Sequence, residues 1–302
     1  FEDNAEFGLG MRLAITKHTT EALSLLDECA DKLDANLVSA LKNQEQNDEA
    51  GIKAQRENVE KLKAALKGID SPKAASLAEY ADYLVKKSIW IMGGDGWAYD
   101  IGYGGLDHVM ATGEDVNILV LDTEVYSNTG GQASKSTNRG AVALFAAAGK
   151  RAGKKDLGLI AMSYKNVYVG RVAVGANDIQ TLKVFQEAEA HHGPSLIIAY
   201  CPCINHGFDL GSQLAHQKMA VDSGYWPLLR YNPDLVAQGK APLTLDSKKP
   251  TIPVAEYIYT ENRYKALTRT KPEAAKELAD QLQKEVDARF AFYEKMAAEA
   301  VV

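Results

Sequence analysis

A glycine turn that carries one carboxylate is the part of this sequence best suited to chemistry. Gly94, Asp95 and Gly96 follow a short apolar run and precede a stretch with helical spacing. Glycines at such a place let backbone N–H groups approach a phosphate, and the start of the helix adds a positive dipole end. A carboxylate beside a phosphate is repulsive unless a cation lies between them, and Mg²⁺ prefers carboxylate, water and phosphate oxygens. The turn therefore predicts a site for magnesium and a phosphate.

A second ligand for such a cation is expected one crossover further along the chain. Thr123 lies 28 residues after Asp95 and belongs to a polar loop, 122–131, that follows another apolar run. Because parallel strands present their carboxyl ends at one edge of a sheet, both residues are expected at the same edge. The alternative for Gly94–Gly96 alone is an ordinary β-turn with Asx geometry, since such tripeptides are common in loops.

Alternating strands and helices must position these residues. Short apolar runs predict buried strands, and apolar residues at three- and four-residue intervals predict helices. The expected strands are 88–92, 116–121, 157–162 and 195–200, and the expected helices are 97–112, 178–191 and 209–221. Strands and helices in alternation are typical of an α/β fold with a mostly parallel sheet and crossover helices.

Helical segments are predicted on both sides of this core. Apolar spacing indicates long helices over 11–87, with the polar stretch 43–58 as a solvated turn or exposed helix end. Prolines mark a loop-rich region after Trp226, and a last amphipathic helix is expected over 272–296. We therefore expect a helical segment, an α/β core, and a connector with C-terminal helices, over residues 1–87, 88–225 and 226–302.

The composition excludes several classes of protein. With 302 residues, 46% hydrophobic and 25% charged residues and a net charge of −6, the chain is globular rather than disordered. The acidic excess argues against a nucleic-acid surface, and the apolar runs are too short for a membrane span. Three cysteines are too few for a disulfide framework, and there is neither an initial Met nor a signal peptide. We expect a cytoplasmic protein, and a piece of a longer one.

The sequence around the turn resembles the pyruvate:ferredoxin oxidoreductases of the large single-chain type. The Gly-Asp-Gly turn with its later Thr/Asn loop is similar to the magnesium-diphosphate motif of the thiamine diphosphate fold. The segments that carry the resemblance are Gly94–Gly102, Val125–Gln132, Ser134–Thr137, Phe1–Gly8 and Cys203–Gly207. It implies a thiamine-diphosphate-binding fold with an N-terminal helical insertion and a C-terminal helical extension.

The same resemblance implies roles for individual residues. Mg²⁺ would be held by the side chains of Asp95 and Thr123 and by the carbonyl of Val125. Asn128 would face the substrate and assist catalysis; the alternative is an Asx turn. Cys203 would be a 4Fe-4S ligand; the alternative is a small buried side chain at a strand end. The residues implied to contact thiamine diphosphate are Phe1, Gly94, Asp95, Gly96, Trp97, Thr123, Glu124, Val125, Tyr126, Ser127 and Asn128.

Three further residues have less specific interpretations. Cys29 and Cys201 have no counterpart in the family pattern and are expected to be structural. His206 follows Cys203 closely enough to tune a cluster, and plain packing is the alternative.

The implied activity is oxidative decarboxylation of pyruvate with coenzyme A, with electrons passing through iron-sulfur clusters to ferredoxin or flavodoxin. The chain lacks the CxxC and third Cys of the cluster, and the carboxylate that acts on the cofactor's pyrimidine. The remainder of the same polypeptide or a partner chain would supply them, and a homodimer is expected. The alternatives are a related 2-oxoacid:ferredoxin oxidoreductase, a non-redox thiamine-dependent decarboxylase or synthase, and a non-catalytic scaffold.

Overall fold

A computed structural model of the chain describes residues 4–299, which fall into two compact units. Leu9–Ile89 form a helical unit, and the residues before Leu9 together with those from Trp90 onward form an α/β unit. Phe1, which the resemblance places at the cofactor, lies outside the described residues. Each unit has its own core and is described by itself.

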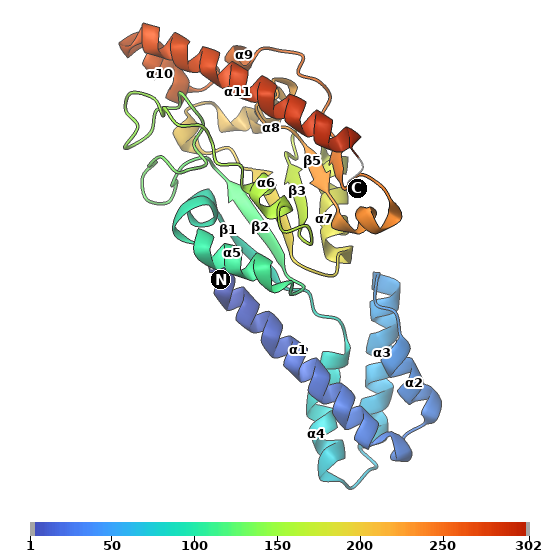
Figure 1. Cartoon of the computed structure of the whole chain (residues 1–302). Coiled ribbons are helices and arrows are strands. Elements are labelled where there is room, and N and C mark those ends of the chain that lie inside the picture. The colour runs from blue at the N-terminus through green and yellow to red at the C-terminus, as the bar shows by residue number, and fades with distance from the viewer. Residues whose placement is uncertain (1–3, 300–302) are drawn as a thin grey trace. The chain divides into compact units, whose positions relative to one another are not determined.

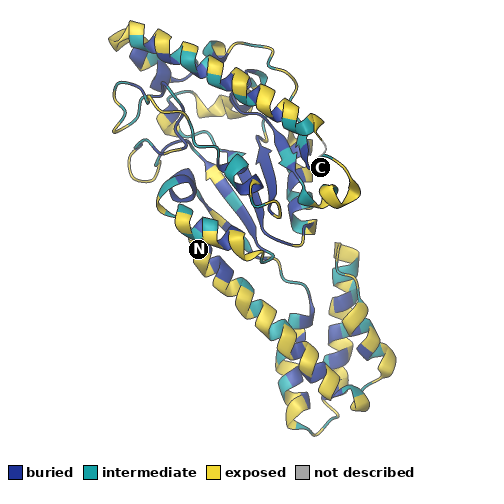
Figure 2. Cartoon of the chain, in the orientation of Figure 1, coloured by how far each residue is buried: buried dark blue, intermediate teal, exposed yellow. Residues whose placement is uncertain are grey.

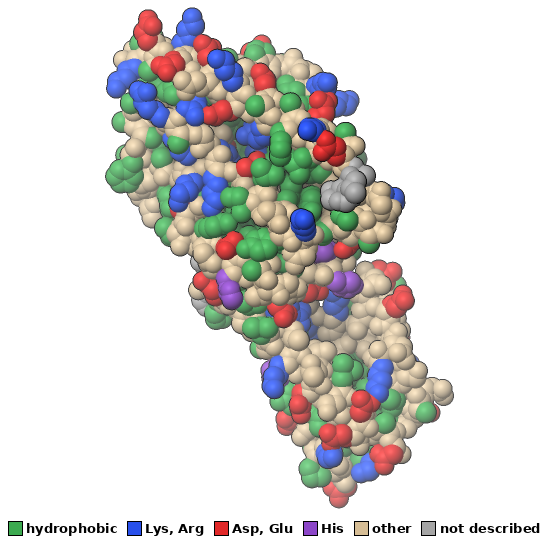
Figure 3. All heavy atoms as spheres, viewed as in Figure 1, with side chains coloured by type: hydrophobic (Ala, Val, Ile, Leu, Met, Phe, Trp, Pro, Cys, Tyr) green, Lys and Arg blue, Asp and Glu red, His purple; other side chains and the backbone are tan. Residues whose placement is uncertain are grey.

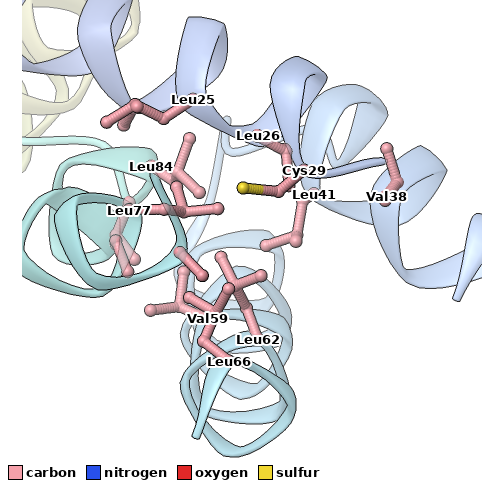
Figure 4. Packing of buried hydrophobic residues seen from close by; sticks show 14 residues of the cluster. Leu25, Leu26, Cys29, Val38, Leu41, Val59, Leu62, Leu66, Leu77 and Leu84 are labelled. Carbon is pink, nitrogen blue, oxygen red and sulfur yellow. The ribbon is translucent and has the colours of Figure 1, made fainter. Parts of the chain in front are cut away.

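The helical unit packs its helices around a common apolar core. Its α-helices are most of α1 (Ala5–Glu28), α2 (Ala35–Asn43), α3 (Glu49–Leu66) and α4 (Pro72–Tyr80). Asp34 and Asp48 cap α2 and α3, because each side chain accepts a hydrogen bond from the backbone N–H three residues later. The second part of the polar stretch 43–58 is thus the start of α3. Figure 4 shows the Cys29 side chain among the leucines of this core, where it is 2% exposed.

The α/β unit is built on one sheet, which within residues 90–299 has the strand order β1-β2-β4-β3-β5-β6. The strands are β1 (Trp90–Gly94), β2 (Asn117–Asp122), β3 (Tyr168–Val172), β4 (Ser195–Tyr200), β5 (Leu229–Tyr231) and β6 (Leu243–Leu245). The first four strands of this order are parallel, and β5 and β6 add an antiparallel edge. The predicted mostly parallel sheet is confirmed. Because β1 and β2 are neighbours, their carboxyl ends lie side by side (Figure 1).

Helices cover both faces of this sheet. On one face α7 (Asp178–Ala190) packs so closely that a Cβ on Gly170 of β3 would lie 2.3 Å from Val184. On the other face Gly158 of α6 (Leu157–Met162) lies against Val169 and Ile198. Figure 2 shows the central strands mostly buried and the helices exposed on their outer sides. The crossover helices therefore sandwich the sheet, as an α/β fold requires.

One predicted strand is wrong, because residues 157–162 form the helix α6. The Asp156 side chain caps it by accepting a hydrogen bond from the backbone N–H of Leu159. A short apolar run has no periodicity that separates a buried strand from a buried helix. The strand in this part of the sheet is β3, Tyr168–Val172, whose glycine and arginine interrupt the apolar pattern.

The helix predicted over 97–112 is present as two shorter pieces. The first piece is a π-helical turn, η3 (Trp97–Ile101), and the second is α5 (Tyr103–Thr112). The helices predicted over 209–221 and 272–296 are present as α8 (Gln213–Asp222) and α11 (Pro272–Ala298). The region between them, predicted to be loop-rich, also contains β5, β6, η6 (Pro233–Gln238), α9 (Val254–Ile258) and α10 (Asn262–Thr270).

The charged side chains of the surface are of both signs, as the composition of the chain predicts. Figure 3 shows acidic and basic side chains interspersed over the face in view. Among the helices of residues 4–299, none combines the length and apolar character needed to cross a membrane.

We expect Gly170→Ala to lower the free energy of unfolding by about 1–3 kcal/mol, because the added methyl group overpacks the contact with Val184. Thermal denaturation of the full-length protein measures the change. The matched control is the double variant with Val184→Ala, which removes the colliding methyl groups. Its loss should be smaller than the sum of the two single losses. Additive losses would contradict the close packing of α7 on β3.

Candidate active site

A cavity of about 860 Å³ lies at the carboxyl ends of β1 and β2. Its walls come from β1 with the turn and η3 that follow it, from the end of β2 with the loop that follows, and from the first residue after β4. Small-molecule and cofactor sites have volumes of this order. Of the described residues that the resemblance assigns to the cofactor, all but Glu124 line it: Gly94, Asp95, Gly96, Trp97, Thr123, Val125, Tyr126, Ser127 and Asn128.

The three oxygen atoms that the resemblance assigns to Mg²⁺ meet at this cavity. The Thr123 hydroxyl lies 2.8 Å from Asp95 Oδ1 and 2.9 Å from the carbonyl oxygen of Val125. A hydroxyl has one proton, so it donates to one of these two acceptors at a time. A carboxylate, a hydroxyl and a carbonyl this close together form a donor set suited to a hard cation. The residues present therefore fit Mg²⁺.

Asp95 is almost wholly buried, at 1% exposure. Its second oxygen, Oδ2, accepts a hydrogen bond of 2.5 Å from the Ser134 hydroxyl. Burial and the nearby carboxylate of Asp122 raise the pKa of Asp95 to about 7. A bound cation would favour the ionised form, because an opposite charge nearby stabilises a carboxylate. A buried acid with a raised pKa in a cavity wall is typical of a functional position.

Glu124 lies between two cavity residues, but its side chain is buried elsewhere. Its backbone has a left-handed φ of 59°, and the residue is 0% exposed. Its carboxylate is bound by Asn138, Lys154, Tyr225 and Arg263. Burial alone would raise the pKa of Glu124, but the charges of Lys154 and Arg263 hold that pKa at about 2. Glu124 therefore anchors the loop to the protein interior and does not line the cavity.

The Thr123 loop, residues 122–131, closes on itself beyond Val125. The backbone N–H of Tyr126 donates to the carbonyl of Gln132 at 2.9 Å, and the N–H of Gly131 donates to the carbonyl of Tyr126 at 2.8 Å. The ring of Tyr126 lies so close to Gly96 that a Cβ there would come within 2.3 Å of it. Asn128 is exposed and lines the cavity. The turn thus holds the Asn128 amide where the cavity meets solvent.

The cysteine loop, Cys201–Gly207, follows β4 and touches the Thr123 loop. Cys201 lines the cavity, and its N–H donates to the carbonyl of Asp122 at 3.0 Å. Cys203 is partly exposed, and its sulfur lies 3.7 Å from the Asn205 amide nitrogen. His206 Nε2 lies 2.8 Å from the Thr123 carbonyl oxygen, so this nitrogen is the donor. The loop that carries Cys203 therefore contacts the loop that carries Thr123 and Val125, two members of the magnesium donor set.

Ser134 and Lys154 are site residues to which the sequence analysis assigned no role. Ser134 holds Asp95, and the three hydroxyl residues within 134–137 were a signal that could have found it. Lys154 is buried and pairs with Asp122 at 2.8 Å and with Glu124 at 3.1 Å. Its role depends on partners more than 25 residues away, and such pairing leaves no local pattern.

A family model and a set of curated relatives match this chain. The model "Thiamine pyrophosphate enzyme, C-terminal TPP binding domain" matches residues 50–199. A pyruvate-flavodoxin oxidoreductase from Trichormus variabilis is 58% identical over 100% of this chain and 26% of its own length. A pyruvate:ferredoxin oxidoreductase from Moorella thermoacetica is 50% identical over 98% of this chain and 26% of its own length.

A solved structure is a more distant match. A 2-oxoglutarate:ferredoxin oxidoreductase from Magnetococcus marinus covers 38% of this chain at 21% identity, with a TM-score of 0.36, which is too low to support a conclusion. The high identities to the curated relatives extend over nearly the whole chain, although the chain spans about a quarter of their length. Nearly the whole chain is therefore similar to one part of these pyruvate-flavodoxin and pyruvate:ferredoxin oxidoreductases, and residues 50–199 match the thiamine-pyrophosphate-binding domain model.

Proposed function

We propose that this chain is the thiamine-diphosphate- and magnesium-binding part of an enzyme that oxidatively decarboxylates pyruvate with coenzyme A to acetyl-CoA and CO₂. In this proposal the electrons pass through iron-sulfur clusters to ferredoxin or flavodoxin, the acceptors in the names of the relatives. The observation that carries the proposal is the meeting of the Asp95, Thr123 and Val125 oxygens beside a cofactor-sized cavity.

The chain's own part in this reaction is binding and orientation. Asp95, Thr123 and Val125 would hold Mg²⁺, whose positive charge would offset the negative charge of the diphosphate. Gly94 keeps room beside the backbone, because a Cβ there would meet no protein atom within 4 Å. When bound, thiamine diphosphate supplies a nucleophilic carbon and an electron sink for the decarboxylation. Asn128 offers the substrate both a donor and an acceptor through its side-chain amide.

Cys203 is proposed to be one ligand of a 4Fe-4S cluster. Its thiol is partly exposed and free, and it lies on the loop that contacts the Thr123 loop. Cys29 is buried in the helical unit, so the remaining ligands are assigned to the rest of the polypeptide or to a partner chain. The three free thiols support a cytoplasmic location, where thiols stay reduced. Coenzyme A as co-substrate and a homodimer remain predictions from the family resemblance.

Asp95→Asn in the full-length protein should weaken thiamine diphosphate binding in the presence of Mg²⁺ by about 10- to 100-fold, because a buried charged ligand is lost. Quenching of tryptophan fluorescence measures this, since Trp90 and Trp97 line the cavity. The matched control is Asp107→Asn on α5, whose carboxylate binds Tyr103 and Tyr164 outside the cavity. The control should bind thiamine diphosphate with the affinity of the wild type. Unchanged affinity in Asp95→Asn would remove the basis of the proposed metal site.

Cys203→Ala in the full-length protein, purified without oxygen, should lose the iron of one cluster and keep its thiamine diphosphate. Iron analysis, cofactor content and pyruvate-dependent reduction of ferredoxin measure this together. Cys201→Ala is the matched control, because it removes a thiol from the same loop and should keep its iron. If Cys203→Ala also keeps its iron and its electron transfer, Cys203 is a structural residue and the proposed cluster ligand is wrong.

A further inference from the structure

A second cavity, of about 410 Å³, lies under α11 and shares no lining residue with the first. Its floor is one face of the sheet, where Val169 and Arg171 alternate along β3 and Arg171 pairs in register with Ile198 and Leu229. Its roof is a stripe of α11 with helical spacing: Glu285, Ala288, Arg289, Phe292 and Tyr293. The segment 153–159, which leads into α6, closes one side. Two guanidinium groups therefore enter one cavity from opposite elements.

These two arginines carry buried N–H groups without a partner. Arg171 is 7% exposed, and its Nε and Nη2 have no hydrogen-bond partner among residues 4–299. Its guanidinium carbon lies 4.1 Å from the centre of the Trp226 ring, which fixes the plane of the group. Arg289 donates from Nη2 to the carbonyls of Gly224 and Tyr225, but its Nε lacks a partner in the same described range. A buried N–H donor without a hydrogen-bond acceptor destabilises the folded protein, and a bound acceptor would remove that cost.

The acidic side chains of the cavity are already engaged by other groups. Asp156 accepts hydrogen bonds from the Leu159 N–H and the Tyr293 hydroxyl. Glu285 pairs with Arg139 at 2.6 Å. Burial and the charge of Arg171 lower the pKa of Arg289, and the Asp156 carboxylate opposes this shift only in part. Two like charges in one cavity are stabilised by an anion between them.

We propose that this cavity is a binding site for a small oxyanion of the phosphate or carboxylate class, held between Arg171 and Arg289. A guanidinium group presents several N–H donors in a fixed fork that matches two oxygens of such an anion. The cavity volume accommodates an ion of this size with its remaining water. No member of the magnesium donor set lines this cavity, although Lys154, which pairs with Asp122 and Glu124, forms part of its wall.

The test is calorimetric titration of inorganic phosphate into the full-length protein, at constant ionic strength. The protein is loaded with Mg²⁺ and thiamine diphosphate first, so that phosphate does not report on the diphosphate position. A parallel titration with acetate distinguishes the two classes of oxyanion. We expect Arg171→Gln and Arg289→Gln each to weaken binding of the preferred ion at least tenfold, since each removes a charge-assisted hydrogen bond.

Arg230→Gln is the matched control, because its guanidinium is paired with Glu187 and Asp246 and does not line the cavity. It should bind the ion as the wild type does. Arg171→Lys, which keeps the charge and loses the fork, should fall between the wild type and Arg171→Gln. If Arg171→Gln does not fold, Arg289→Gln on the partly exposed side of α11 decides the question alone. The proposal is overturned if neither ion binds the wild type, or if binding survives unchanged in Arg289→Gln.

Discussion

The burial of three carboxylates at two neighbouring strand ends is the constraint on which the site depends. Asp95, Asp122 and Glu124 are each at most 1% exposed. A buried charge costs several kcal/mol unless it is paired and hydrogen-bonded. Lys154 pairs with both Asp122 and Glu124, whereas within the described residues Asp95 has hydroxyl and backbone donors but no ion pair. This difference explains why the unpaired carboxylate, and not its neighbours, is the one suited to a cation.

Segments distant in the sequence supply the hydrogen bonds and ion pairs that stabilise these buried carboxylates and the loops that carry them. Lys150 donates to the carbonyls of Ser134 and Thr137 and so fixes the loop that holds Asp95. Arg263 donates to both Glu124 and Glu261. Removing one partner from such a buried pair typically costs about 3–5 kcal/mol. The region after Trp226 is therefore part of the foundation of the site, although it lines none of the cavity.

Local patterns were enough to predict the elements that carry the ligands. The apolar runs before Gly94 and Thr123 placed two parallel strands correctly, and their shared edge followed from topology. The pattern failed at Leu157–Met162, where a six-residue apolar run fits a helix or a strand equally well. The pairing of Glu124 with Arg263 joins residues 139 positions apart, and a single sequence holds no trace of it. Contacts within an element could be predicted, and contacts that depend on the finished fold could not.

The two glycines of the turn are required for different reasons, and this affects how much such a motif reveals about an unfamiliar protein. A side chain at Gly96 would collide with Tyr126, which belongs to the protein itself. Gly96 would therefore be required by the fold even in a protein of this kind that bound no cofactor. A side chain at Gly94 would meet no protein atom and would enter the cavity instead. A side chain at position 94 is therefore excluded only by what occupies the cavity, whereas a side chain at position 96 is excluded by the packing of the loop whether or not a ligand is bound.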